Sequence, residues 1–354
     1  MRVNVKMKIP NRIRVGILKL GLLSVVAAIG AGCTSGQDRM PLIVAVPARQ
    51  MSKAPFVIAA DQGLYEKHGL DVELWLGEPA FEGGVKTHLR LWTSVRMLLG
   101  LEEAPEPDIT TDGYTPRMLD QMKDPGAPRL IALGSTDCSL HFYVIARPEI
   151  KSLEELKGKR LGLNSDVSTS NFAGLLMIQR MGWDRVQDIS IMIPGRMEDL
   201  RKGRVDGIVG NDGDLEAAQR EGFPVLEHTQ DWNERVAGTS IMVTREWLQD
   251  PMHREAVRRF LMATAEAVAL FHQRPELVVE VLMKWEGMDR EIAESRYKRT
   301  DYIPRKPYPC VEGIENTMRL HDSNEMRRYQ PEDFYDDSFM RELDESGFLD
   351  GLYK

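Results

Sequence analysis

The chain has 354 residues, of which 42% are hydrophobic, and a net charge of −8. Its first 32 residues contain six basic and no acidic side chains, so the remainder carries −14. This acidic body argues against nucleic acid as a partner, because phosphate binding requires a basic surface. The remaining chain is long enough to form two packed domains.

The N-terminus has the pattern of an export signal: basic residues, an apolar run from Leu20 to Ile29, and then small residues. The run is too short to span a bilayer, which takes about 20 residues. Cys33 follows directly, as in a bacterial lipobox, although Gly30 stands where that pattern usually has leucine. We predict a signal peptide over residues 1–32 and a lipidated tether over 33–40. An ordinary cleaved signal with a coincidental cysteine is the alternative.

The following segments alternate between strand and helix patterns. Residues 41–48 predict a buried strand, 54–69 a helix and 70–76 a second strand. Pro55 suits the first turn of that helix, and Gly69 suits its end. Two further strands are predicted at 108–115 and 128–137, each ending in a polar loop. These elements form the first α/β half.

Residues 151–228 show the clearest alternation. Ser152 and Glu155 predict a capping box for a short helix. The predicted strands cover residues 159–164, 188–194, 205–210 and 224–229, and the predicted helices cover 172–182, 197–203 and 214–222. Such alternation predicts βαβ units and a parallel sheet. The segment 239–248 can return the chain to the first half, and 253–275 predicts an amphipathic helix with a core-facing stripe.

Four stretches resemble one family of exported proteins. They are APFVIAADQGLYEKHGLDVEL (54–74), SLEELKGKRLGLN (152–164) before a Ser/Thr loop, MEDLRKGRVDGIVG (197–210) and DESGFLDGLY (344–353). In this order they are similar to periplasmic solute-binding proteins of the nitrate/sulfonate/taurine and thiamine-precursor type. The resemblance implies a two-lobed α/β fold with parallel-rich sheets, a hinge crossover, and delivery of a ligand to an ABC permease.

The resemblance also implies how the chain divides. We expect lobe 1 to comprise residues 41–140 and 240–354, and lobe 2 to comprise residues 141–239. The ligand is expected between the lobes, because ligands bind outside the carboxyl ends of strands and in clefts between domains. Polar residues at predicted strand ends are therefore the candidate ligand contacts. They are Gln50, Lys53, Asp112, Tyr114, Asp137, Ser168, Thr169, Ser170, Asn171, Asn211 and Asp212.

The run Ser168–Asn171 precedes a predicted helix. Its hydroxyls and the free N–H groups of the helix can bind a carboxylate, sulfonate or phosphate oxygen. The structural alternative is simple N-capping by one serine. The sequence leaves both open.

The charge of the ligand also remains open. If Asp112, Asp137 and Asp212 converge, they favour an amine, amidine or aminopyrimidine group, on which Tyr114 or Trp75 could stack. Singly, each carboxylate is more simply a turn or cap residue, and each aromatic a core residue. Lys53 and Arg49 keep an anion possible. Sulfonate, nitrate, carboxylate and aminopyrimidine are all retained.

Signs of catalysis and of metal binding are missing from the sequence. It has no nucleophile elbow, P-loop, dinucleotide fingerprint or zincin motif. Its seven histidines lack metal-ligand spacing, and Cys138 and Cys310 cannot supply the cysteine-rich iron motif of enzymes with this fold. We expect a monomer that is not an enzyme and has no cofactor or metal. The alternatives are an enzyme on this fold, such as an aromatic acid decarboxylase or a thiamine-pyrimidine synthesis type, and a ligand sensor for a membrane receptor. For the two cysteines, buried thiols are favoured over a disulfide.

Overall fold

The computed structural model describes residues 39–47, 50–76, 106–124, 126, 129–166 and 168–354. The predicted signal peptide, Cys33 and Arg49 lie outside the described residues. From residue 39 onward the described chain belongs to one compact unit. Within it, no helix combines the length and the apolar character that crossing a membrane requires.

The first sheet has five strands in the order β2-β1-β3-β10-β4. They are β1 Met40–Val46, β2 Leu70–Leu76, β3 Ile109–Gly113, β4 Leu130–Ser135 and β10 Thr239–Thr244. β2 and β3 run parallel to β1, whereas β10 runs antiparallel to β3 and β4. The expected return of the chain to the first half at residue 239 is therefore confirmed.

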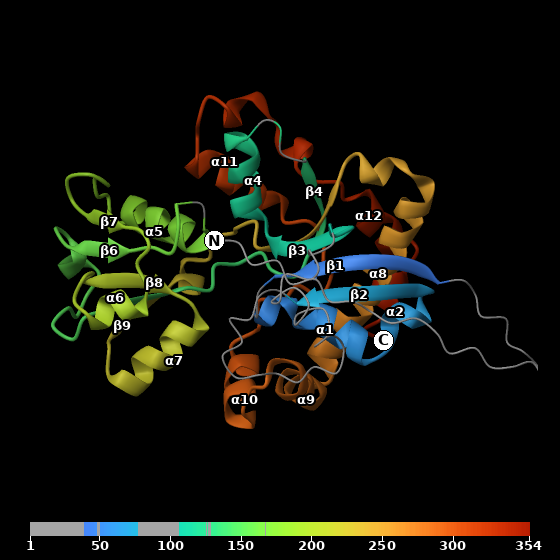
Figure 1. Cartoon of the computed structure of the whole chain (residues 1–354), viewed down its shortest axis with the longest axis horizontal. Helices are drawn as coiled ribbons and strands as arrows, with labels where there is room; N and C mark the ends of the chain where they lie inside the picture. Colours follow the sequence, from blue (N-terminus) through green and yellow to red (C-terminus); the bar gives the residue numbers. More distant parts are fainter. Residues whose placement is uncertain (1–38, 48–49, 77–105, 125, 127–128, 167) are drawn as a thin grey trace, which may run out of the picture. The chain divides into compact units, whose positions relative to one another are not determined.

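Helices from both ends of the chain pack on the first sheet (Figure 1). They are α1 Ala54–Asp61, α2 Leu64–Lys67, α8 Pro251–Gln273, α9 Pro275–Glu286, α10 Arg290–Lys298, α12 Ser338–Glu345 and α13 Phe348–Gly351. The helix predicted over 54–69 is interrupted at Gly63, whose φ of 66° lies in the left-handed region. α8 buries Phe260, which stacks on Tyr65 at 5.3 Å, so the predicted core stripe is confirmed.

The second sheet has the order β7-β6-β8-β5-β9. Its strands are β5 Tyr143–Ala146, β6 Arg160–Gly162, β7 Ser190–Met192, β8 Gly207–Gly210 and β9 Val225–His228, and its helices are α5 Thr169–Arg180, α6 Met197–Arg201 and α7 Asp212–Glu221. β6 pairs parallel with β7 and β8, as the alternation predicted. β5 was not predicted; it is a four-residue, fully buried strand antiparallel to β8 and β9.

One local prediction, the capping box, was wrong, and a predicted strand and a predicted helix are present with different boundaries. Glu155 Oε2 accepts a hydrogen bond from the backbone N–H of Lys151 at 2.8 Å, and a 3-10 turn forms in place of a capped helix. The strand predicted over 108–115 ends at Gly113, and Tyr114 begins α4 Tyr114–Lys123. α5 begins at Thr169, three residues before the predicted start, because the Ser168 side chain already caps it.

Two segments, 136–142 and 229–238, connect the sheets, and they meet at an antiparallel bridge between Ser139 and Arg235. Beside that bridge Cys138 and Cys310 form a disulfide with a Cα–Cα distance of 5.6 Å, so the favoured prediction of two thiols was wrong. The cysteines are 172 residues apart, and no spacing in the sequence reveals their proximity. Cys310 precedes α11 Val311–Leu320, in which Gly313 packs against the backbone of Val236 with no room for a side chain.

Short 3-10 turns complete the described chain. They are η1 Met51–Lys53, η2 Glu154–Leu156, η3 Thr229–Trp232, η4 Trp247–Gln249, η5 Met326–Arg328 and η6 Pro331–Asp333. η1 places Lys53 directly before α1, and η3 opens the second connecting segment.

Candidate ligand-binding site

Seven polar and aromatic side chains gather near the connecting segments, and we refer to them as the junction cluster. They are Asp137, His141, Tyr143, Asp212, His228, Arg299 and Tyr302. Asp137 and His141 belong to a connecting segment, the next three residues to the second sheet and α7, and the last two to the chain after α10. The sequence predicted only Asp137 and Asp212 among these seven.

Asp137 fixes the orientation of His141. One carboxylate oxygen, Oδ1, accepts hydrogen bonds from the backbone N–H of Ser139 at 2.9 Å and from His141 Nε2 at 3.0 Å. The His141 ring stacks on Tyr302, with centroids 3.3 Å apart and an interplanar angle of 23°. Burial raises the pKa of Tyr302 well above its usual range, and the nearby Asp137 charge adds to the shift. The Tyr302 phenol therefore stays protonated at neutral pH and can donate a hydrogen bond.

Asp212, at the start of α7, bonds to other members of the junction cluster much as Asp137 does. Its Oδ1 accepts a hydrogen bond from the Tyr143 hydroxyl at 3.1 Å and lies 3.5 Å from Arg299 Nη2. Burial, reinforced by the Asp212 charge, raises the pKa of Tyr143 to about 12, so this phenol also stays protonated. The Tyr143 ring stacks on His228 at 4.5 Å. Chain segments far apart in sequence thus meet through one carboxylate.

Four buried nitrogen atoms of the junction cluster have no hydrogen-bond partner among the described residues. They are Arg299 Nε, Arg299 Nη2, His141 Nδ1 and His228 Nε2. Leaving a buried polar group unpaired costs about 1–3 kcal/mol, so native proteins rarely do so without a bound water, ion or ligand. Burial also lowers the pKa of His228, which favours its neutral form. This concentration of unpaired atoms makes the junction cluster the best candidate for a ligand site.

A second polar group surrounds Asp112, at the end of β3. Lys53 is 1% exposed, and its Nζ lies 3.2 Å from Asp112 Oδ1. Arg117 Nη2 donates to the other oxygen, Oδ2, at 3.0 Å. Burial lowers the pKa of Lys53 even though the Asp112 charge opposes the shift. The structure thus brings Lys53 and Asp112 together, as an internal ion pair.

The serine run lies at the start of α5. Ser168 Oγ accepts the backbone N–H of Asn171 at 3.2 Å and lies 2.9 Å from Ser170 Oγ, so the capping alternative is present in the structure. Thr169 Oγ1 lies 3.3 Å from the position that a Cβ on Gly113 would take. The start of α5 therefore approaches the end of β3 and the Asp112 group. Ser170 and Asn171 are buried.

Four residues that the sequence suggested for the site are occupied elsewhere or exposed. Tyr114 is fully buried in the core, where its hydroxyl donates to the carbonyls of Leu130 and Phe334, each at 2.7 Å. Asn211 uses its side-chain oxygen to cap α7, and Gln50 is exposed. Trp75 donates to Glu73 at 3.1 Å on the edge strand β2.

The three aspartates do not act as one free negative patch. Asp112 is held by two cations, Asp137 by His141 and a backbone N–H, and Asp212 by Tyr143 and Arg299. Each already has partners within the chain, so their presence does not by itself select a cationic ligand. Because all three carboxylates are already paired, they do not form the unpaired negative charge that would favour a cationic ligand.

Additional ion pairs connect α10 with α7. Arg296 Nε and Nη2 donate to the two oxygens of Glu216 at 2.9 and 3.2 Å, and Arg299 Nη2 lies 3.7 Å from Glu216 Oε1. No pattern in the sequence marked Arg296, which lies within an ordinary charged helix, or Arg299 and Tyr302, which follow that helix. The histidines looked scattered because their proximity is created only by the tertiary fold.

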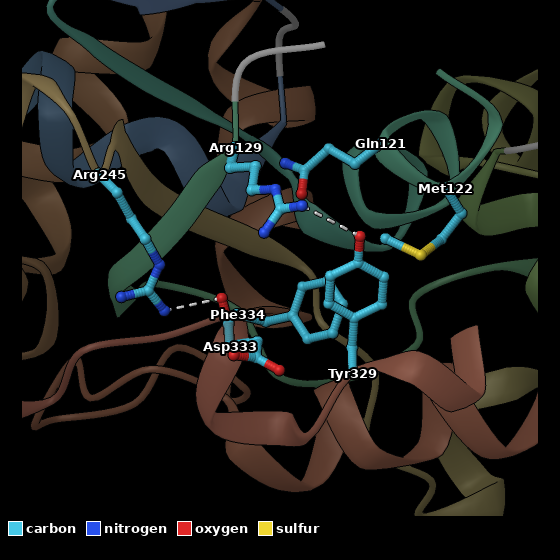
Figure 2. Close-up of a pocket in the computed structure, with 7 residues that line it drawn as sticks. All are labelled: Gln121, Met122, Arg129, Arg245, Tyr329, Asp333 and Phe334. Atoms are coloured by element: carbon cyan, nitrogen blue, oxygen red, sulfur yellow. Dashed lines mark hydrogen bonds between the residues drawn. The ribbon is translucent and has the colours of Figure 1, made fainter. Parts of the chain in front are cut away.

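A separate small cavity lies between α4, the ends of β4 and β10, and the loop before α12. Figure 2 shows Arg129 reaching the Tyr329 hydroxyl, at 3.4 Å, and Arg245 reaching the backbone of Asp333, at 2.8 Å. Its volume of about 30 Å³ suits a water molecule rather than an organic solute. None of its lining residues belongs to the junction cluster. Among the described residues, no group of three or more His, Cys, Asp or Glu side chains could hold a metal ion.

Comparison with known proteins identifies the fold. Residues 130–277 match the family model described as NMT1/THI5 like. The structure is similar to the periplasmic aliphatic sulphonate binding protein SsuA from Escherichia coli, at 19% identity and a TM-score of 0.60, covering 83% of this chain and 98% of that one. It is also similar to the periplasmic nitrate-binding protein NrtA from Synechocystis, at 13% identity and a TM-score of 0.62, covering 87% and 89%.

A third similar structure is a putative periplasmic sulfonate-binding protein of an ABC transporter from Methylobacillus flagellatus, at 15% identity and a TM-score of 0.61, covering 88% of this chain and 96% of that one. No curated protein sequence matches the chain. The chain therefore has the two-lobed α/β fold of periplasmic binding proteins, with one sheet in each lobe, as the sequence predicted.

Proposed function

We propose that this protein is the extracytoplasmic solute-binding component of an ABC importer. It captures a small polar organic molecule or anion at the junction cluster and delivers it to a membrane permease. We further propose that residues 1–32 direct export, that lipid on Cys33 anchors the protein, and that it acts as a monomer. The lobe boundaries predicted from the sequence belong to the same proposal.

One observation carries this proposal: the unpaired buried nitrogens of the junction cluster come from both lobes. His228 lies on the second sheet, and Arg299 follows a helix that packs on the first. A ligand that pairs with both lobes stabilises their closed arrangement, and its release permits opening. Binding without chemistry then suffices for capture and delivery.

Hinge motion would take place in the two connecting segments. They pair with each other at the Ser139–Arg235 bridge and at Phe142 and Thr229, where each backbone N–H donates to the other residue. Closure would bring α10 and α7 together through Arg296 and Glu216, which pair in this structure. The energy of these pairs adds to that of the ligand, so they set how readily the unliganded protein opens.

An enzyme on the same fold is the second candidate, and one contact favours it. Asp137 holds His141 by a hydrogen bond, the arrangement by which a carboxylate orients a histidine general base. Decarboxylation or hydrolysis would consume the ligand. The two candidates therefore differ in whether the bound molecule is recovered unchanged.

The test uses protein purified after expression of the full-length chain. Thermal unfolding is followed against alkyl and aromatic sulfonates, nitrate, aromatic carboxylates and aminopyrimidines, and each bound compound is then analysed for turnover. A ligand at 100 times its dissociation constant stabilises the fold by about 2.7 kcal/mol. Arg299→Ala should remove the shift. His253→Gln, whose ring stacks on Trp247 outside the junction cluster, is the matched control.

Recovery of the ligand unchanged supports the importer component, whereas product formation overturns it in favour of the enzyme. Anchoring is tested separately by replacing Cys33 with serine in the full-length chain. The variant should leave the membrane fraction and stay folded. An unchanged membrane association would refute the lipid anchor without touching the ligand site.

A further inference from the structure

Helix α11 is attached to both connecting segments. The disulfide joins Cys310, the residue before α11, to Cys138 of the first segment. Gly313 packs on the second segment, and the backbone of Val236 leaves no room there for a side chain. The Val236 N–H in turn donates to the Cys138 carbonyl at 3.2 Å. One covalent bond and one close backbone contact therefore hold both segments against the same helix.

The same helix also contacts both lobes. Thr317 Oγ1 is buried and lies 2.9 Å from Thr115 Oγ1 of α4, a helix that packs on the first sheet. At the other end of the contact surface, Leu320 packs on the apolar core of the second sheet. The ring of His321, the next residue, lies 6.1 Å from the ring of Phe172 in α5. α11 thus joins the lobes in addition to the two connecting segments.

A helix attached in this way restrains hinge motion. Rotation of the lobes requires the connecting segments to change their backbone angles, and both segments are held against α11. Separation of the lobes also pulls the end of α11 away from α5, and packed contacts break rather than stretch. We propose that α11 limits how far the lobes open, and that the Cys138–Cys310 disulfide maintains this restraint. This inference rests on the proposed function, because it assumes the hinge motion of a solute-binding protein.

The disulfide makes the restraint sensitive to a dithiol reductant. Cys138 is partly exposed, whereas Cys310 is 5% exposed. A thiolate of the reductant attacks the Cys138 sulfur, the S–S bond breaks, and the Cys310 sulfur leaves as a thiolate that takes up a proton. The second thiol of the reductant then displaces Cys138, which also gains a proton, so the reductant ends as a disulfide and both cysteines end as thiols. The first connecting segment is then no longer covalently attached to α11.

The test is small-angle X-ray scattering of the purified protein, dialysed free of bound solutes, before and after reduction with dithiothreitol. Alkylation and mass spectrometry verify that Cys138 and Cys310 have both been reduced, and circular dichroism verifies that the protein stays folded. Reduction should increase the radius of gyration, because the released lobes separate further. The double variant Cys138→Ser, Cys310→Ser should have the larger radius from the start and should not respond to dithiothreitol.

Gly313→Ala tests the restraint while the disulfide is intact. Its methyl group meets the Val236 backbone and has to displace α11, so the radius of gyration should increase as it does on reduction. Gly351→Ala is the matched control, because a Cβ at this glycine of α13 lies in open space and should leave the radius unchanged. If the reduced protein or the double variant fails to stay folded, Gly313→Ala and its control still decide the question.

An unchanged radius of gyration in the fully reduced, folded protein would overturn this inference. An unchanged radius in Gly313→Ala, or an equal increase in Gly351→Ala, would do the same. These measurements are made without a ligand, so a protein that lacks the restraint can still bind and deliver a solute. Turnover of a bound solute would refute the proposed function and leave the scattering result unchanged. The two failures are therefore distinguishable.

Discussion

Asp112 and Asp212 lie in similar places, since Asp112 is near the end of β3, Asp212 closely follows β8, and each pairs with an arginine, yet their surroundings differ. Asp112 has a cation on each oxygen, Lys53 at 3.2 Å and Arg117 at 3.0 Å. Asp212 accepts one hydrogen bond, from Tyr143, and holds Arg299 only by charge. Arg117 leaves Nε unpaired, whereas Arg299 leaves both Nε and Nη2 unpaired.

This difference in hydrogen bonding indicates that the Asp112 group stabilises the fold and that the junction cluster binds a ligand, although both groups contain partly buried charges. The Asp112 group satisfies its carboxylate and its lysine internally, so its removal should mainly cost stability. The junction cluster contains nitrogen atoms that the chain leaves unpaired, so its variants should mainly cost ligand affinity. The following predictions use the free energy of unfolding of variants to test which contacts stabilise the fold.

The largest expected effect belongs to the disulfide that anchors the segment carrying Asp137. Replacing both Cys138 and Cys310 with serine removes a link between residues 172 positions apart. Losing such a cross-link typically costs about 2–4 kcal/mol in the free energy of unfolding. Chemical denaturation with and without reductant measures it. Reductant should destabilise the unmodified protein and leave the double variant unchanged; equal responses would contradict a structural disulfide.

Asp112→Ala should have the next largest effect. It leaves the buried Lys53 ammonium without its carboxylate, and breaking a buried pair costs about 3 kcal/mol or more, reduced here because Asp112 is partly exposed. Lys53→Met leaves Asp112 paired with Arg117 and removes a buried charge, so it should cost much less. Urea denaturation of both variants tests the asymmetry. A larger loss for Lys53→Met would show that Lys53, and not Asp112, is the partner that stabilises the group.

Much of the fold follows from local patterns in the sequence. Gly182, Gly203 and Gly222 terminate helices where their positions predicted, and each has a positive φ. The core stripe of α8 follows from its 3.6-residue period. By contrast, β5 is only four buried residues long and has no alternation, so periodicity could not distinguish it from a loop.

The candidate site was less predictable, because its members come from separate segments. Asp137 and Asp212 were found since they follow strands, where ligands gather in α/β sheets. His141 and His228 are 87 residues apart, and Arg299 follows a surface helix, so only tertiary packing joins them. Tyr114 was misjudged because the helix α4 begins one residue after β3 and turns its ring into the core.

A smaller effect is expected for the pair between α10 and α7. Glu216→Ala removes a bidentate contact with Arg296, whose side chain is 15% exposed, and should cost about 1 kcal/mol in the free energy of unfolding. Glu276→Ala is the control, because its pair with Arg290 is exposed and should cost less than about 0.5 kcal/mol. Equal costs would mean that the contact between the lobes contributes no more than a surface pair.

The smallest effect is a decline of stability in mild acid. Burial lowers the pKa of His228, His272 and His321 below the usual 6.5, so between the two values the unfolded chain binds more protons than the folded one. Their contribution to stability is complete above about pH 6.5 and is lost as the pH falls below that value. Denaturation midpoints measured between pH 7.5 and 5.5 should decrease, and the decrease should be smaller in His228→Asn.

In the unmodified protein, a saturating ligand that donates to His228 would oppose protonation and steepen the decline in affinity with acid, whereas one that accepts from it would flatten that decline. The sign of this slope therefore reports which side of the hydrogen bond the junction cluster offers at His228, and a slope unchanged by His228→Asn would place the ligand away from this histidine.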